Sequence, residues 1–192
     1  MPSDFDVIDA LRERAARLDR ATAAFLDSQA EPLREAATSV VDTLRAGRTV
    51  FTCGNGGSTA LAMHIETELL ARYQSDRRPL PCLFLGAAAS TITATANDYA
   101  FEDVFARPLE ALGREGDLLI ALTTSGTSPN VIRALEVAEA RGLQAILVTG
   151  DRAPERSGVV LRWPGDGADQ VQDGHQLLVH ALMDAVEAEL GA

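Results

Sequence analysis

Two residues that could exchange protons with a substrate, His64 and Glu68, are four positions apart in this chain. Residues 58–73 have a helical pattern, and a spacing of four places both side chains on one face of that helix. An imidazole and a carboxylate can act as acid and base, and both are ligands for a divalent metal ion. Such a pair alone is weak evidence, because most pairs of this kind are surface features.

A second polar stripe lies near the C-terminal end, where residues 168–190 also have a helical pattern. Four side chains follow one another at intervals of three, four and four, which places them in a narrow stripe on that helix. They are Asp169, Gln172, Gln176 and His180. If the two helices meet, the two faces together supply a base, an acid and metal ligands. His175 lies off this stripe, and we interpret it as structural.

Two loops carry the features of a phosphate site. "CGNGGST" (53–59) and "TTSGTSPN" (123–130) each follow an apolar run and precede a helix, and five of the six residues at 123–128 carry hydroxyls. Glycines allow close backbone approach, and the N-terminus of a helix attracts anions. We expect Ser58 to cap the first helix and Ser128, before Pro129, to cap the second. A tight turn would explain the first loop alone, but the two together predict a sugar-phosphate site.

The elements that must position these residues alternate along the chain. Apolar runs near residues 49–53, 82–85, 117–122, 144–149 and 158–163 predict five strands, separated by helical patterns. Continuously apolar strands alternating with helices are typical of a parallel sheet covered on both faces, with ligands at its carboxyl edge. Residues 5–27 and 31–47 predict two further N-terminal helices, the second beginning near Pro32 and ending at Gly47. They pack on the domain or form a subunit interface.

Composition narrows the class of protein. The net charge of -11 argues against general nucleic-acid or anionic-membrane binding. No signal peptide and no membrane-spanning stretch is evident, so we expect a cytoplasmic protein. Cys53 and Cys82 lie in apolar runs and are expected to be buried, reduced thiols.

Taken together, these motifs resemble a known family. "CGNGGS", "AMH" with Glu68, "AND" (96–98), "TTSGTS" with "NVI", and "AD" with Gln172 and His180 resemble the SIS (sugar isomerase) family, and within it the sedoheptulose-7-phosphate isomerases. The resemblance covers nearly the whole chain. It implies a single SIS domain over residues 1–192, with a helical pair at 1–47 and an α/β/α sandwich around a five-stranded parallel sheet at 48–192.

The resemblance also implies an activity: interconversion of sedoheptulose 7-phosphate and an aldoheptose 7-phosphate through an enediol. Glu68 matches the general base and His180 its acid/base partner. Positions around the substrate match Asn55, Gly56, Gly57, Ser58, Arg72, Asn97, Asp98, Thr123, Thr124, Ser125, Ser128, Asp169 and Gln172. Some members bind zinc, through positions that match His64, Glu68, Gln172 and His180. The family's homotetramers build their sites across subunit boundaries, with the N-terminal helices in the interface.

This chain also departs from the family pattern. Leu61 stands where many members have Asp, and "VQDGH" places Asp173 and Gly174 inside the last helix, where glycine costs roughly 1 kcal/mol relative to alanine. The departures leave open whether the product is the manno sugar or its C2 epimer. Two alternatives also stand: a non-catalytic SIS module that binds a sugar phosphate or a protein, and an SIS isomerase of another sugar phosphate.

Overall fold

The chain forms a five-stranded parallel sheet, as predicted. The computed structural model describes residues 5–156 and 158–191. The strands are β1 (Val50–Gly54), β2 (Cys82–Phe84), β3 (Leu118–Thr123), β4 (Gln144–Gly150) and β5 (Val159–Trp163). They are ordered β2-β1-β3-β4-β5, and every neighbouring pair is parallel. In β1 and β3 every residue is buried, which is why these strands are apolar throughout.

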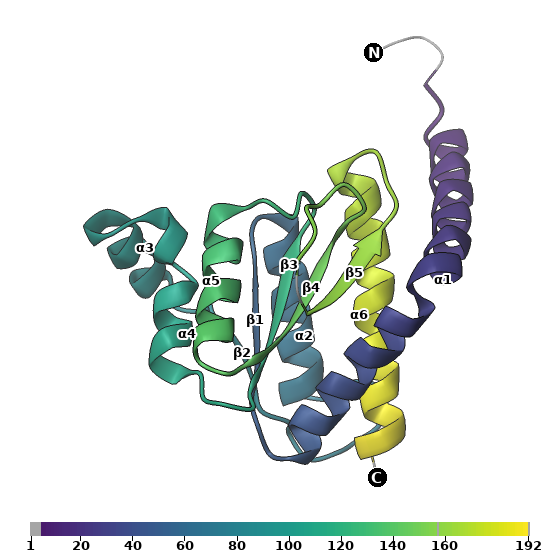
Figure 1. Cartoon of the computed structure of the whole chain (residues 1–192). Coiled ribbons are helices and arrows are strands. Elements are labelled where there is room, and N and C mark those ends of the chain that lie inside the picture. Colours follow the sequence, from purple (N-terminus) through teal and green to yellow (C-terminus); the bar gives the residue numbers. More distant parts are fainter. Residues whose placement is uncertain (1–4, 157, 192) are drawn as a thin grey trace.

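Helices cover both faces of this sheet (Figure 1). They are α1 (Val7–Arg45), α2 (Gly57–Leu70), α3 (Ala89–Asp98), α4 (Ala106–Leu112), α5 (Pro129–Ala140) and α6 (Ala168–Leu190), with a short 3₁₀ turn η1 (Phe101–Asp103). The α2 crossover connects β1 to β2, toward one edge of the sheet, and the α5 crossover connects β3 to β4, toward the opposite edge. Because crossovers are right-handed, these two helices lie on opposite faces. The C-terminal helix α6 packs beside α2, and this pairing brings the two polar stripes together.

The two cysteines lie in the core, as expected. Both are free and buried, Cys53 on β1 and Cys82 on β2. Burial disfavours the thiolate, so it raises the pKa of Cys53 to about 12 and raises that of Cys82 as well. Neither is an activated nucleophile.

The prediction of two separate N-terminal helices is wrong, because α1 is one helix of 39 residues. Pro32 lies inside it, removing the hydrogen bond to the Ser28 carbonyl. Figure 1 shows that α1 changes direction partway along its length. Three residues before Pro32, Gln29 links α1 to the sheet: its Oε1 accepts a hydrogen bond of 3.1 Å from the Arg162 amide on β5. Packing against β5 and α6 therefore outweighs the cost of the proline.

The two ends of α1 differ in burial. Its C-terminal part contributes Phe25, Val40 and Leu44 to the core, whereas Ile8 and Leu11 are more than half exposed. In Figure 1 the N-terminal half extends beyond the body of the domain. Within the described ranges, no helix combines the length and apolar character needed to cross a bilayer.

The glycine in α6 has a packing role. The helix continues without interruption through Gly174. This residue lies against the Trp163 indole, and a Cβ there would overlap the ring. The indole also stacks on Phe25 of α1, with ring centroids 5.1 Å apart. Trp163 is therefore held between α1 and α6, and the absent side chain at Gly174 makes room for it.

Candidate functional site

The two helices bring His64 and His180 together. His64 lies on α2 and His180 on α6, and their Nε2 atoms are 3.1 Å apart. The rings meet edge to face, with centroids 5.3 Å apart. This juxtaposition of side chains 116 residues apart in the chain is the geometric centre of the candidate site.

Glu68 lies behind the His64 ring. Its Oε1 is 3.4 Å from His64 Nδ1, the ring nitrogen that faces away from His180. The Glu68 side chain is 15% exposed, and that of His64 is 33% exposed. A carboxylate at Nδ1 favours the tautomer that carries its proton there, and so orients the ring. His64 and Glu68, predicted to share one face of the helix, are therefore in contact, and the His64 ring reaches His180 on α6.

The predicted stripe on α6 divides along its length. Gln176 is next to His180, with its Nε2 2.8 Å from His180 Nε2. Gln172 lies about two turns before His180, toward the start of α6, where its amide occupies the space that a Cβ on Gly57 would fill. Gly57 thus allows α6 to approach the first turn of α2. The position beside the histidine pair is taken by Gln176.

The segment after α2 adds a residue that the sequence patterns did not single out. The helix ends at Leu70, so Arg72 lies beyond it and is exposed, contrary to the expectation that it continues the helical face. Tyr73 is half-buried, with its ring centroid 6.1 Å from that of His180. Burial is the main factor that raises the pKa of Tyr73, so its hydroxyl stays protonated. Its contact with His180 is made from the loop that joins α2 to β2, which leaves no periodic signal in the sequence.

The two glycine- and hydroxyl-rich loops converge, as predicted, because β1 and β3 are neighbours. Asn55 and Asn130 join them: each side chain donates its amide N–H to the other's carbonyl oxygen, at 2.8 Å in both directions. Asn130 is 1% exposed. Sequence reasoning missed Asn130, although a polar residue that begins an otherwise buried helical face is a recognisable signal.

The hydroxyls of the second loop face one another. Thr123 Oγ1 lies 3.0 Å from Ser128 Oγ and 3.4 Å from Ser125 Oγ. Ser128 is the N-cap residue of α5, as predicted, but no described side chain makes a capping hydrogen bond there. The prediction that Ser58 caps α2 is wrong: Gly56, with a φ of 55°, is the N-cap, and Ser58 lies buried in the first turn. Of the three serines, Ser125 is exposed, Ser128 is half-buried and Ser58 is buried, and none of them closes a helix end through its hydroxyl.

A cavity of about 300 Å³ opens at this carboxyl edge of the sheet. It is lined by Thr124 and Ser125 on one side and by the start of α6 on the other. Arg152, whose guanidinium pairs with Asp166 at 2.5 Å, also lines it and was not predicted. Along α2, His64 lies seven residues past Gly57, so the histidine pair is roughly 10 Å from the loops. A substrate that reaches both must be an extended molecule with an anionic end.

Three other predicted residues lie away from this cluster. Asn97 and Asp98 are exposed at the end of α3, where Asn97 donates to Asp98 at 2.7 Å. In Figure 1, α3 lies on the far side of α5 from α6. Asp169 accepts a hydrogen bond of 3.1 Å from Arg14 of α1, and Arg14 also pairs with Asp173 at 2.7 Å. Within one chain, the structure therefore ties Asp169 to α1 and does not bring Asp98 to the histidines.

The histidine pair fits a metal ion. Two nitrogens bound to one tetrahedral zinc at 2.0–2.1 Å lie roughly 3.3 Å apart, close to the separation of the two Nε2 atoms. Glu68 would stand behind His64, as carboxylates do behind zinc-bound histidines. No group of three or more His, Cys, Asp or Glu side chains in the described part of the chain is arranged to hold an ion. A complete ligand set would therefore need an amide oxygen or a movement of Glu68.

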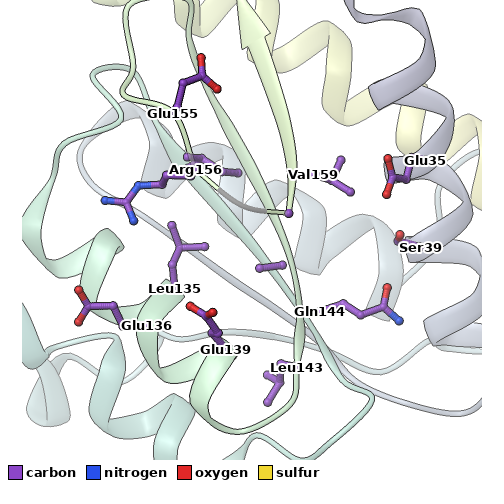
Figure 2. Close-up of a pocket in the computed structure, with 13 residues that line it drawn as sticks. Glu35, Ser39, Leu135, Glu136, Glu139, Leu143, Gln144, Glu155, Arg156 and Val159 are labelled. Atoms are coloured by element: carbon purple, nitrogen blue, oxygen red, sulfur yellow. The ribbon is translucent and has the colours of Figure 1, made fainter.

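A larger cavity lies elsewhere. A groove of about 640 Å³ lies between α1, α5 and the β4–β5 edge. Figure 2 shows Glu35, Leu135, Glu139 and Val159 among the residues that line it. Its lining residues include none of the residues predicted for the site. Its acidic rim does not suit a phosphate, so we place the candidate site at the histidine pair and the two loops.

The chain is similar to known proteins along most of its length. Residues 15–150 match the SIS domain family. Phosphoheptose isomerase of Shewanella denitrificans is 38% identical over 166 residues, which cover 83% of this chain and 85% of that protein. The Shewanella oneidensis phosphoheptose isomerase is 39% identical, with 83% and 84% covered.

Solved structures of phosphoheptose isomerases are also similar to this chain. A phosphoheptose isomerase from Francisella tularensis superimposes with a TM-score of 0.88 at 32% identity, covering 96% of this chain and all of the other. The structure of phosphoheptose isomerase GmhA from Neisseria gonorrhoeae gives a TM-score of 0.86, also at 32% identity, and covers 95% of this chain and 100% of that one. With its paired loops, its α2–α6 histidine pair and this similarity along most of its length, the chain belongs to the phosphoheptose isomerase family of SIS-domain proteins.

Proposed function

We propose that this protein isomerises sedoheptulose 7-phosphate to an aldoheptose 7-phosphate, either D-glycero-D-manno-heptose 7-phosphate or its C2 epimer. The observation that carries the proposal is the pairing of His64 and His180 at 3.1 Å, with Glu68 beside them, about two helical turns from two converging hydroxyl loops. The loops suit the phosphate, and the spacing leaves C1 and C2 of a long sugar at the acid–base groups.

The chemistry is a proton transfer that needs no oxidant. Glu68 removes a proton from C1 while the C2 carbonyl oxygen gains one, which gives the 1,2-enediol. A proton then adds to C2, and the C1 hydroxyl loses its proton to form the aldehyde. We assign Glu68 as the base at carbon and His180 as the group that exchanges protons with the substrate oxygens. Thr123, Ser125 and Ser128 hold the phosphate with Ser58, which fixes the reacting carbons in position.

We also propose that His64 and His180 bind zinc, with Glu68 and Gln172 as the remaining ligands implied by the family resemblance. When bound, the ion would polarise the substrate oxygens at C1 and C2. Glu68 contacts His64 Nδ1 at 3.4 Å, so it would have to move from this position to bind the ion; in the position seen here it orients His64 and acts as the base. His64 then has two functions: it binds the ion through Nε2 and is oriented through Nδ1.

The protein is further proposed to act as a homotetramer. Ile8 and Leu11 on the projecting half of α1 are 53% and 63% exposed, and an apolar helical face of this kind suits burial against another subunit. Asp98, exposed at the end of α3, and Arg72, exposed beyond the end of α2, are the groups we expect a neighbouring subunit to supply. The substrate would then bind between subunits.

The direct test is NMR of sedoheptulose 7-phosphate incubated with the protein, with chelator alone and with added zinc. Appearance of an aldoheptose phosphate establishes the isomerase, and its proton couplings distinguish the manno product from its C2 epimer. Loss of turnover in chelator, restored by zinc, supports the metal. If no conversion occurs in any condition while the phosphate resonance still responds to the protein, the assigned reaction is wrong and a sugar-phosphate-binding module takes its place.

A further inference from the structure

A buried guanidinium caps the end of the helix that carries Glu68. Arg77 lies beyond the end of α2, and its side chain is only 2% exposed. Its Nη2 donates to the Glu68 carbonyl at 2.5 Å, and its Nη1 donates to the Leu69 carbonyl at 3.0 Å and to the Arg78 carbonyl at 3.1 Å. The residue thus bonds to the main chain of the proposed base itself.

These bonds satisfy carbonyl groups at the end of α2 that the helix itself leaves without donors. The last four carbonyls of a helix have no amide partner within it, and that end of the helix carries a partial negative charge. Arg77 supplies both the missing donors and a positive charge. A planar guanidinium with several donors binds two successive carbonyls at once, which an ammonium cannot do in the same way. The last turn of α2, and with it the direction of Glu68, is thereby fixed.

The same guanidinium is held from the other helix. Arg77 Nε lies 3.5 Å from Glu187 Oε2 on α6, a charge contact. Glu187 also accepts hydrogen bonds from the Ser75 amide, at 2.6 Å, and from the Ser75 hydroxyl. These bonds from Ser75, with a smaller contribution from Arg77, lower the pKa of Glu187 and keep it charged. A buried arginine needs such a partner, because an unpaired charge there would be costly.

The anchored segment also reaches the other half of the site. Residues 71–77 leave α2, pass Tyr73 beside His180, and return to Arg77. Gln74 donates to Asp184 of α6 at 3.2 Å, one turn beyond His180. The segment is therefore attached to α6 at two residues, Asp184 and Glu187. These attachments hold both the end of the helix that carries Glu68 and the ring of Tyr73.

We propose that Arg77 is a positioning residue of the isomerase, which with Glu187 fixes Glu68 and Tyr73 relative to His180. This inference rests on the proposed function of Glu68 and His180. Its effect is expected on the chemical step, because the phosphate loops lie at the opposite ends of α2 and α6. A misplacement of about 1 Å at a reacting group can lower the rate by up to roughly 100-fold.

The test compares Arg77→Gln with Arg78→Gln, an adjacent and exposed arginine as the matched control. We expect Arg77→Gln to lower kcat roughly 10- to 100-fold, with KM within about twofold of the parent. Arg78→Gln should leave both unchanged. Arg77→Lys keeps the charge but loses the planar fork, so its kcat should fall between the two. Glu187→Gln removes the charged partner but leaves Arg77 in place, and it should lower kcat as well. This variant tests the inference if Arg77→Gln does not fold.

A second measurement does not depend on turnover. The His64 ring protons should shift in Arg77→Gln at fixed pH, because Glu68 contacts that ring, while those of buried His175 stay in place. A folded Arg77→Gln or Glu187→Gln protein with parent kcat and an unshifted His64 would overturn the inference. If the parent chain itself fails to isomerise the sugar, the proposed function is wrong, and the His64 shift still reports whether Arg77 positions Glu68.

Discussion

His64 and His180 approach each other through the same kind of atom, Nε2 to Nε2, at 3.1 Å. The Glu68 carboxylate at His64 Nδ1 favours the tautomer with its proton on that nitrogen, which leaves the lone pair of His64 Nε2 facing His180. Gln176 approaches the same His180 nitrogen at 2.8 Å. Two imidazole nitrogens at this separation are the arrangement that a single zinc-type ion would bind.

Replacing the proposed base gives the first prediction. Glu68→Gln keeps the size and a hydrogen-bonding group but cannot accept the C1 proton, so turnover should fall by roughly 10²- to 10⁴-fold. Thermal unfolding and the elution volume in size-exclusion chromatography should match the parent. The measurement is the NMR assay at saturating substrate. Parent-level turnover by a folded Glu68→Gln protein would remove Glu68 from the role of base.

His180 is predicted to serve both the reaction and the metal. His180→Ala should lower kcat by at least roughly 100-fold and, in the same preparation, reduce bound zinc measured by elemental analysis. His175→Gln provides a comparison, since it removes a buried histidine of the same helix outside the pair. Unchanged zinc content in His180→Ala would restrict His180 to acid–base chemistry.

The hydroxyl cluster is predicted to control substrate affinity. Thr123→Val keeps the shape of the side chain and removes the hydroxyl that touches Ser125 and Ser128. Loss of one hydrogen bond to a charged phosphate costs about 1.5–3 kcal/mol, so KM should rise roughly 10- to 150-fold. Thr93→Val on α3 is the matched control, because that hydroxyl bonds only to its own helix among the described residues. Equal KM values in the two variants would contradict phosphate binding at Thr123.

Gly174→Ala is predicted to destabilise the protein, although alanine is the better helix former by about 1 kcal/mol. The new Cβ would overlap the Trp163 indole, which is backed by Phe25 and cannot withdraw, and overpacking of this kind costs about 1–3 kcal/mol. The free energy of unfolding in urea measures the net loss. In a Trp163→Leu background the same substitution should become neutral or stabilising, and a loss of equal size there would exclude the clash as its cause.

Acid sensitivity is predicted from His175. Burial lowers the pKa of this histidine to about 4, from about 6.5 in the unfolded chain, and the nearby Thr149 backbone offsets part of the effect. The unfolded state therefore binds a proton first as the pH falls. The stabilisation is complete above pH 6.5 and is lost toward pH 4, by about 2 kcal/mol between pH 7 and pH 5. Urea unfolding at both values should show this loss, and His175→Gln should reduce it; an equal loss in the variant would assign it to other groups.

The sheet, its order of elements and the extent of α6 could be predicted because they depend on local patterns of apolar residues. The sequence could not predict that residues 7–45 form one continuous helix. It shows the cost of Pro32, but not the packing of α1 on β5 that offsets this cost. The predicted N-cap of α2, Ser58, lies two residues past the observed one, because glycine and serine can both occupy an N-cap and only the backbone angle at Gly56 decides between them.

The residues of the site divide in the same way. His64 and Glu68 are predictable because one helix fixes their spacing. Contacts between helices, such as Gln176 with His180 and Arg77 with the end of α2, depend on rotation and packing that no short pattern encodes. Asn130 and Tyr73 belong to this second group, as both act through partners far along the chain.

The reciprocal bonds between Asn55 and Asn130 also bear on how this protein ages. Asn55 is followed by Gly56, the neighbour that least obstructs attack of the next backbone nitrogen on the side-chain amide, which is the route of spontaneous deamidation. Conversion to aspartate would replace a donor with a negative charge facing the Asn130 carbonyl oxygen, so one of the two bonds would become a repulsion. A single slow chemical lesion at this side chain would therefore weaken the link between the two loops, although β1 and β3 stay paired beneath them.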